Sequence, residues 1–233
     1  MTLRAPRFLI LETSGRVGQV ALAEGEQVLA VRRLDETRRH ARDLAPAVSD
    51  LFKEQGWNPR DVDGVIVDVG PGSYTGLRVG IMSAKAFAYA TGCAVFGVQA
   101  FSAIATQAPE DARRLDVIAD AQQGKVYVQR FVRPAATAPW EAESDLRIEI
   151  VPDWLGNFLD DAWVAGPGLT IYRDGLKAAV NQVDAALWDP RPQSLLLLAL
   201  PRFHRNESDD SWALEPLYLR PSSAEEKWRA TSR

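Results

Sequence analysis

The spacing of apolar residues at the start of the chain predicts three strands followed by a helix. Strand-like segments cover residues 8–13, 19–24 and 27–34. Gly25 fits a tight turn between the second and the third. Apolar positions then recur at helical spacing over residues 39–55, so one face of this helix is expected to be buried. The order predicts an antiparallel meander packed against an amphipathic helix.

The next apolar run has a different character. Residues 63–70, DGVIVDVG, are almost continuously apolar and β-branched, which is typical of a strand buried on both faces of a parallel sheet. A helical pattern at residues 75–91 and a short strand at 94–98 follow. Three strands, a helix, a strand, a helix and a strand in this order predict a ribonuclease-H-like lobe, which we place at residues 1–106.

The second half of the chain repeats this order in outline. Residues 115–132 read as strand, glycine turn and strand, and a loop rich in alanine and proline follows at 133–143. Further elements are expected as a helix at 152–160, a strand at 162–166, a helix at 169–179, a short apolar stretch at 185–189 and a helix at 194–203. Two such halves predict an α/β chain with an actin-like (ASKHA) fold, in which two ribonuclease-H-like lobes carry mixed sheets flanked by helices. The smaller C-terminal lobe is expected at 107–210 and an extended tail at 211–233.

Composition narrows the class of protein. The chain has 233 residues, is 46% hydrophobic, and carries 27 Lys and Arg against 31 Asp and Glu, for a net charge of −4. It lacks the basic excess expected of a protein that binds nucleic acid alone. Cys93 is the only cysteine, which excludes an internal disulfide and a multi-thiolate metal site. The apolar runs are too short for a signal peptide or a membrane span, so we expect a cytoplasmic protein without a membrane role.

The stretch GPGSYTGLRVG, residues 70–80, is a strand-to-helix turn whose free N–H groups could hold an anion. It fits neither common phosphate motif. A phosphate-loop NTPase needs Lys after its second glycine, where this chain has Leu77, and a dinucleotide fingerprint needs glycine where it has Thr75. The alternative is a tight turn in which Ser73 or Thr75 caps the helix. The residues assigned to this structural loop are Gly70, Gly72, Ser73, Thr75 and Gly76.

The helix expected at 75–91 has two unlike sides. Small residues such as Gly76 and Gly80 gather on one side, where a sheet or helix can approach closely. The opposite side carries Arg78, Met82, Lys85 and Tyr89, with Ile81 at its edge. Arginine, methionine and aromatic residues are enriched where proteins meet. Periodicity alone equally allows Ile81 and Met82 to complete the core.

Two carboxylates offer a catalytic alternative. Glu12 ends the first strand and Asp68 lies near the end of the fourth, so the two could share a magnesium ion as in an ATPase or a nuclease. If strand parity turns Asp68 to the other face, this pair does not form. A second glycine turn before a helix supplies Gly166 and Gly168, where actin-like ATPases hold adenosine. These four residues are the candidates for a nucleotide site.

Other chemistries find no matching pattern. His40 and His204 are the only histidines and lack the paired spacing of a zinc hydrolase. Ser14 and Ser73 are not surrounded by a G-x-S-x-G elbow. We therefore assign no catalytic residue and no metal ligand from these patterns.

Several stretches resemble the bacterial TsaB (YeaZ) family of tRNA threonylcarbamoyladenosine biosynthesis proteins. They are LETS at 11–14, HARDLAP at 40–46, GPGSYTGLRVG at 70–80, DAQQGKVY at 120–127 and EPLYLRP at 215–221. The resemblance implies an actin-like fold with a reduced second lobe. It also implies an accessory subunit that dimerises and acts as a scaffold, without an activity or a cofactor of its own.

The same resemblance implies partners. Family members pair with a larger TsaD-like catalytic paralogue, which binds metal through paired histidines and transfers threonylcarbamoyl to the adenosine beside the anticodon. A small ATPase subunit joins them, tRNA is reached through the complex, and a nucleotide at the partner junction is an open alternative, as is a homodimer when the chain is alone. The histidine pair is missing here, because His40 has no second histidine one turn away. Glu12 stands where the family usually has aspartate, and Asp68 where it has an apolar or small residue.

The family pairs through the first two helices of its N-terminal lobe, which agrees with the unusual side of the 75–91 helix. The expected partner interface comprises Leu44, Val48, Tyr74, Arg78, Ile81, Met82, Lys85 and Tyr89.

Overall fold

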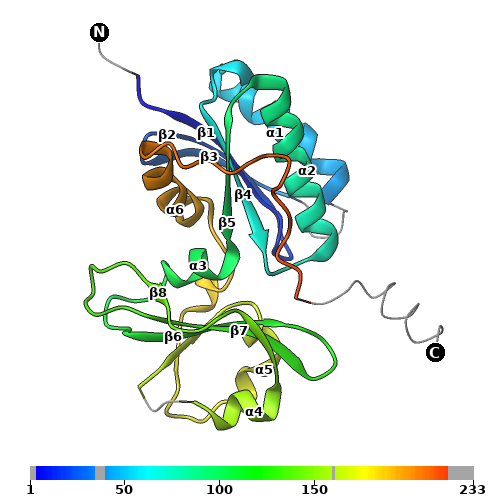
Figure 1. Cartoon of the computed structure of the whole chain (residues 1–233). Helices are drawn as coiled ribbons and strands as arrows, with labels where there is room; N and C mark the ends of the chain where they lie inside the picture. The colour runs from blue at the N-terminus through cyan, green and yellow to red at the C-terminus, as the bar shows by residue number, and fades with distance from the viewer. Residues whose placement is uncertain (1–3, 35–39, 159–160, 220–233) are drawn as a thin grey trace, which may run out of the picture.

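The first lobe is built on a five-stranded mixed sheet. The computed structural model describes residues 4–34, 40–158 and 161–219 (Figure 1). The strands are β1 (Arg7–Glu12), β2 (Gln19–Glu24), β3 (Gln27–Arg33), β4 (Gly64–Gly70) and β5 (Ala94–Gln99), in the order β3-β2-β1-β4-β5. The first three strands are antiparallel, whereas β4 runs parallel to both β1 and β5. The predicted meander and the parallel strand at 63–70 are confirmed.

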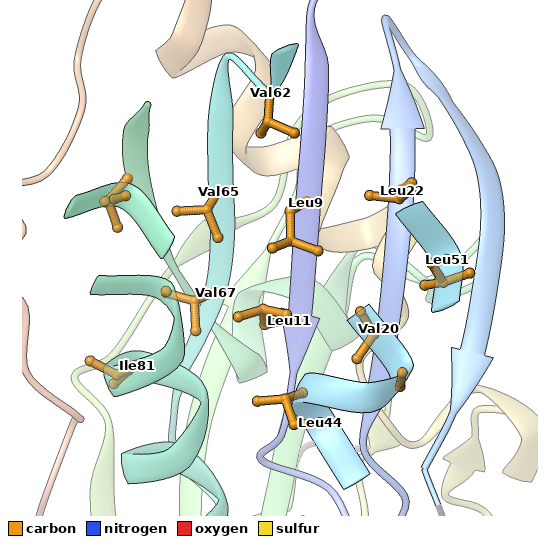
Figure 2. Close-up of a cluster of buried hydrophobic side chains, with 14 of the residues drawn as sticks. Leu9, Leu11, Val20, Leu22, Leu44, Leu51, Val62, Val65, Val67 and Ile81 are labelled. Atoms are coloured by element: carbon orange, nitrogen blue, oxygen red, sulfur yellow. The ribbon is translucent and has the colours of Figure 1, made fainter. Parts of the chain in front are cut away.

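Helices cover both faces of this sheet. The helices are α1 (His40–Gln55), α2 (Tyr74–Thr91), α3 (Ala100–Ala105) and α6 (Pro192–His204), and a short 3-10 helix, η1 (Pro59–Asp61), precedes β4. The α1 and α2 helices pack on one face, and α6 packs on the other (Figure 1). Figure 2 shows how Leu9 of β1, Val67 of β4 and Leu44 of α1 meet between the sheet and the helices. Each such fully buried aliphatic side chain stabilises the fold by about 1.5–3 kcal/mol.

The second lobe is smaller and has shorter elements. Its strands are β6 (Arg114–Asp120), β7 (Lys125–Val132), β8 (Glu141–Ala142), β9 (Arg147–Ile150), β10 (Trp163–Ala165) and β11 (Asn181–Gln182). They follow the order β11-β10-β6-β7-β8, and β9 pairs with β7. The helices are α4 (Val151–Gly156) and α5 (Leu169–Tyr172), with 3-10 turns η2 (Arg173–Gly175) and η3 (Ala185–Leu187). The α3 helix links the lobes, since Phe101 and Ile104 pack with the β6 core.

Several predicted elements of this lobe differ in length or position from the observed ones. The helix expected at 169–179 is a single α-helical turn followed by η2, because only Leu169 of α5 is buried and Gly175 ends the pattern. The helix expected at 152–160 begins one residue earlier and ends at Gly156; residues 159–160 lie outside the described residues. The stretch 185–189 contains a 3-10 turn, while the strand lies at 181–182.

The boundary expected at residue 210 also needs correction. Leu195 and Ala199 of α6 are buried against Phe8 and Ile10 of the first sheet. The chain therefore returns from the second lobe to complete the first, because the apolar side of α6 fills the face that α1 and α2 leave open. Residues 220–233 of the expected tail lie outside the described residues. In the part of the chain that is described, no helix is both long and apolar enough to span a membrane.

Candidate functional site

The glycine-rich loop before α2 packs directly on the loop that follows β1. The Ser73 N–H donates to the Ser14 carbonyl over 2.8 Å. A Cβ atom at Gly72 would overlap Ser14, and one at Gly76 would overlap the carbonyl oxygen of Thr13. Any larger residue at these two positions would push the loops apart. The glycines thus serve a close backbone approach.

Several N–H groups of this loop donate hydrogen bonds within the protein. The Gly70 N–H donates to Asp68 Oδ1 over 2.6 Å, and the Gly76 N–H donates to the Ser73 hydroxyl over 3.2 Å as an N-terminal cap of α2. Ser73, one of the two predicted capping residues, is therefore the cap. Thr75 is exposed in the first turn of α2. Together with the Ser73 N–H, these N–H groups already have partners and are not available to a phosphate.

Glu12 and Asp68 lie side by side at the ends of β1 and β4, and both are fully buried. Glu12 Oε1 accepts hydrogen bonds from the Ser14 N–H at 2.8 Å, the Ser14 hydroxyl at 2.9 Å and the Gly15 N–H at 3.0 Å. The second oxygens, Glu12 Oε2 and Asp68 Oδ2, have no hydrogen-bond partner. The parity argument against the pair is wrong, because the register places both side chains on one face.

Burial raises the pKa values of both carboxyl groups. Loss of hydration, and then the negative charge of Asp68, raise the pKa of Glu12 to about 8. Burial likewise raises the pKa of Asp68 to about 7. The pair therefore favours a shared proton near neutral pH over two negative charges.

The other candidates for a nucleotide site lie in the second lobe. The Gly168 N–H donates to the Ile118 carbonyl over 3.0 Å, and a Cβ at Gly166 would overlap that same carbonyl oxygen. Both glycines are buried in the contact between β6 and the turn after β10. Within residues 4–34, 40–158 and 161–219, no group of three or more His, Cys, Asp or Glu side chains is placed to hold a metal ion.

A groove of about 680 Å³ lies between α1 and α2. Its lining is mostly apolar, with small residues on α2. The lining includes Val48 and Phe52 of α1 and Ala86, Phe87 and Ala90 of α2. Ala86 and Ala90 are exposed, so their side chains face the open groove. Such a surface buries apolar area only when another molecule covers it.

Comparison with known proteins identifies the family. The family model described as "TsaD: tRNA N6-adenosine threonylcarbamoyltransferase" matches residues 27–143. TsaB from Bacillus subtilis is 27% identical, over 95% of this chain and 97% of that protein. An uncharacterised protein from Mycobacterium tuberculosis is 33% identical, over 75% of this chain and 81% of its own. The solved structure of YeaZ from Pseudomonas aeruginosa has a TM-score of 0.76 at 26% identity, and the match covers 92% of this chain and 100% of that one. This chain belongs to the TsaB (YeaZ) branch of the TsaD family.

Membership of the TsaB branch confirms the α/β, actin-like fold with two lobes that the sequence predicts.

Two residues of the expected TsaB-type interface belong to the core. Leu44 and Ile81 are both only 2% exposed. Ile81 lies on the stripe of α2 that faces the sheet, together with Leu77 and Ala84. Their side chains are unavailable to a partner, so this part of the expected interface is wrong.

The outer side of α2 is covered in part by the chain's own C-terminal segment, residues 206–219. Arg78 Nε donates to the Tyr218 hydroxyl over 2.9 Å, and Lys85 Nζ donates to the Trp212 carbonyl over 3.1 Å. The Tyr74 and Tyr218 rings stack with centroids 4.8 Å apart. Sequence reasoning missed this contact. The large apolar residues of the segment, Trp212, Leu214 and Leu217, were the available signal.

Proposed function

We propose that this protein acts in tRNA threonylcarbamoyladenosine biosynthesis as a noncatalytic subunit that binds a TsaD-like catalytic paralogue. Relatives from Bacillus subtilis and Escherichia coli are named tRNA threonylcarbamoyladenosine biosynthesis protein TsaB. The observation that carries the proposal is the open apolar groove between α1 and α2. In the same proposal, a small ATPase subunit joins the complex, and tRNA is bound through the complex as a whole.

The shape and chemistry of the groove favour another helix as its occupant. Small side chains at Ala86 and Ala90 let a helix approach closely, while Val48 and Phe87 offer apolar contact on either side. A paralogue with the same fold carries an equivalent pair of helices. Two such pairs can pack around an approximate two-fold axis, which lets each groove receive the other's helices.

The acidic pair supports a role without catalysis. Glu12 and Asp68 are fully buried, and Glu12 is hydrogen-bonded within its own loop. A substrate phosphate could reach them only after the structure around them had opened. The alternative function, an ATPase or a metal-dependent nuclease that uses these two carboxylates, rests on their adjacency alone. We propose no cofactor of the chain's own; a nucleotide at the junction with the partner stays a prediction.

A single added charge in the groove tests the docking. Ala86→Glu should weaken binding of the TsaD-like paralogue from the same organism by about 100-fold or more, because the carboxylate would be desolvated without a partner. Isothermal titration calorimetry with the full chain measures the Kd. Ala179→Glu, at an exposed alanine of the second lobe, is the matched control and should bind like wild type.

Both variants should melt at the wild-type temperature, since both alanines are exposed. Unchanged binding by folded Ala86→Glu would show that the groove is not the docking site.

A further inference from the structure

A second exposed apolar surface adjoins the groove and includes the C-terminal segment. Ten large apolar side chains are exposed among the described residues, and five of them lie on α2 or on residues 206–219. These five are Met82, Tyr89, Trp212, Leu217 and Tyr218. Exposed apolar residues scattered singly need no explanation, but a gathering of this kind marks a surface that another protein covers.

The most exposed aromatic residues of this surface are held in place. Trp212 is 80% exposed and Tyr89 is 83% exposed, and their rings meet edge to face with centroids 6.4 Å apart. The Trp212 N–H donates to Asp210 Oδ1 over 2.8 Å, and the Trp212 carbonyl accepts from Lys85. The indole ring therefore projects from a backbone that is already fixed, which lowers the entropy lost when a partner covers it.

The rest of the segment anchors this arrangement to the first sheet. The Asp209 N–H donates to the Val95 carbonyl, and the Leu217 N–H donates to the Val69 carbonyl, both over 2.8 Å. Leu214 packs against the core between the sheet and α2. Arg202 of α6 pairs with Asp209 at 2.8 Å. The segment is thus a built part of the lobe along the edge strand β5.

The groove and this surface are continuous along α2. Met82 lies four residues before Ala86, and Tyr89 lies three residues after it, so both side chains are neighbours of Ala86 on the helix surface. A molecule that fills the groove at Ala86 and Ala90 therefore meets Met82 and Tyr89, and beyond them Trp212. We name Met82, Tyr89 and Trp212 the rim.

Charge favours a protein over a nucleic acid at the rim. Residues 206–219 contain four acidic residues and no lysine or arginine. Of the nearby basic groups on α2, Lys85 and Arg78 already donate to the segment. Phosphates would be repelled where the segment lies, whereas aromatic and methionine side chains are typical anchors at the centre of protein interfaces.

We propose that the rim is part of the docking surface for the TsaD-like paralogue and that Trp212 is its main anchor. This inference rests on the proposed function, since it assigns to the same partner a surface that the α1–α2 groove does not include. The C-terminal segment then contributes to binding through its own side chains, in addition to covering the edge of the sheet.

Truncation of the anchor tests this assignment. Trp212→Ala should raise the Kd for the TsaD-like paralogue at least about tenfold, and Tyr89→Ala should raise it less, in titrations of the full chain. Leu197→Ala is the matched control, because Leu197 is 57% exposed on α6, on the opposite face of the sheet. It should leave the Kd unchanged. The melting temperatures of all three variants should match wild type.

The outcomes separate this inference from the proposed function. If Ala86→Glu abolishes binding while Trp212→Ala and wild type have the same Kd, the rim assignment is wrong and the groove still docks the partner. If neither substitution affects binding, neither the groove nor the rim docks the partner; a wild-type chain that does not bind the TsaD-like paralogue at all would show that the proposed function itself is wrong. If Trp212→Ala disrupts only self-association or only binding of tRNA, the rim serves a different occupant and the inference is overturned.

Discussion

At the scale of single residues, the buried carboxylates of Glu12 and Asp68 have the most direct consequence for stability. Two acidic side chains lie together without solvent exposure, and each has one oxygen without a hydrogen-bond partner. Burial makes two negative charges costly here, so the folded chain takes up protons that the unfolded chain releases. The arrangement makes the stability of the fold depend on pH in a definite direction.

The sign of this dependence follows from the raised pKa values. Between the ordinary pKa of Glu12, 4.5, and its folded value of about 8, the folded state binds more protons than the unfolded state. The free energy of unfolding should therefore fall as pH rises through this window. Glu12→Gln should flatten the fall and stabilise the chain by about 1–3 kcal/mol at pH 8.5, because the amide donates a hydrogen bond without a charge.

Urea unfolding at pH 5.5, 7 and 8.5, with all other conditions unchanged, measures the free energy of unfolding of the wild type and of Glu12→Gln. Glu110→Gln, at an exposed position, is the control and should follow the wild-type curve. A wild-type chain that becomes more stable from pH 5.5 to 8.5 would contradict the description of a protonated pair.

At the scale of elements, neighbouring residues of α2 lie in different environments, one in the core and the next on the surface. Ile81 faces the sheet and is 2% exposed, whereas its neighbour Met82 is 62% exposed. The side chains differ in environment because successive residues on a helix point about 100° apart. A charge at these two positions should therefore have opposite consequences for folding and for binding.

Ile81→Asp should destabilise the chain by at least about 3 kcal/mol, since it buries an unpaired carboxylate and removes apolar contacts. Met82→Asp should leave the melting temperature near that of wild type but weaken binding of the TsaD-like paralogue. Circular dichroism melts and titration calorimetry measure the two effects. Equal melting temperatures for both variants would show that Ile81 is not a core residue.

The elements of the first lobe could be predicted because their patterns are long. The residues of β4 are buried throughout, so their apolar run indicated a central strand directly. The second lobe contains strands and helices such as β10 and α5, of three and four residues, and such lengths are too short for periodicity to identify. The placement of α6 on the first sheet had no local signal, because an apolar helix can cover either lobe.

The candidate site was only partly accessible from sequence for a similar reason. An apolar residue on a helix can face the core or a partner, so the pattern could not separate Ile81 from Met82. The adjacency of Glu12 and Asp68 followed from the predicted topology, but not the burial that raises their pKa values. The contact between Lys85 and Trp212 joins residues 127 positions apart and could not be inferred from either segment.

At the scale of the whole molecule, the chain crosses from the first lobe to the second and returns. The α3 helix carries it across, and α6 and the C-terminal segment complete the first sheet on the way back. Gln107 Nε2 donates to the carbonyls of Leu187 and Asp189, both over 3.0 Å, where the two crossings meet. The surface proposed to bind the partner is thus assembled from α1, α2 and the segment at 206–219, which are far apart in the sequence.

The central claim is that this protein supports catalysis by docking and supplies no reacting group. Threonylcarbamoyl transfer to tRNA by a reconstituted complex of the TsaD-like paralogue and the small ATPase subunit tests it most directly. Transfer should require the chain, and the double variant Glu12→Gln/Asp68→Asn should support transfer within about threefold of wild type. A folded, partner-bound double variant that loses transfer by about 100-fold or more, as removal of a general acid or base does, would contradict the claim.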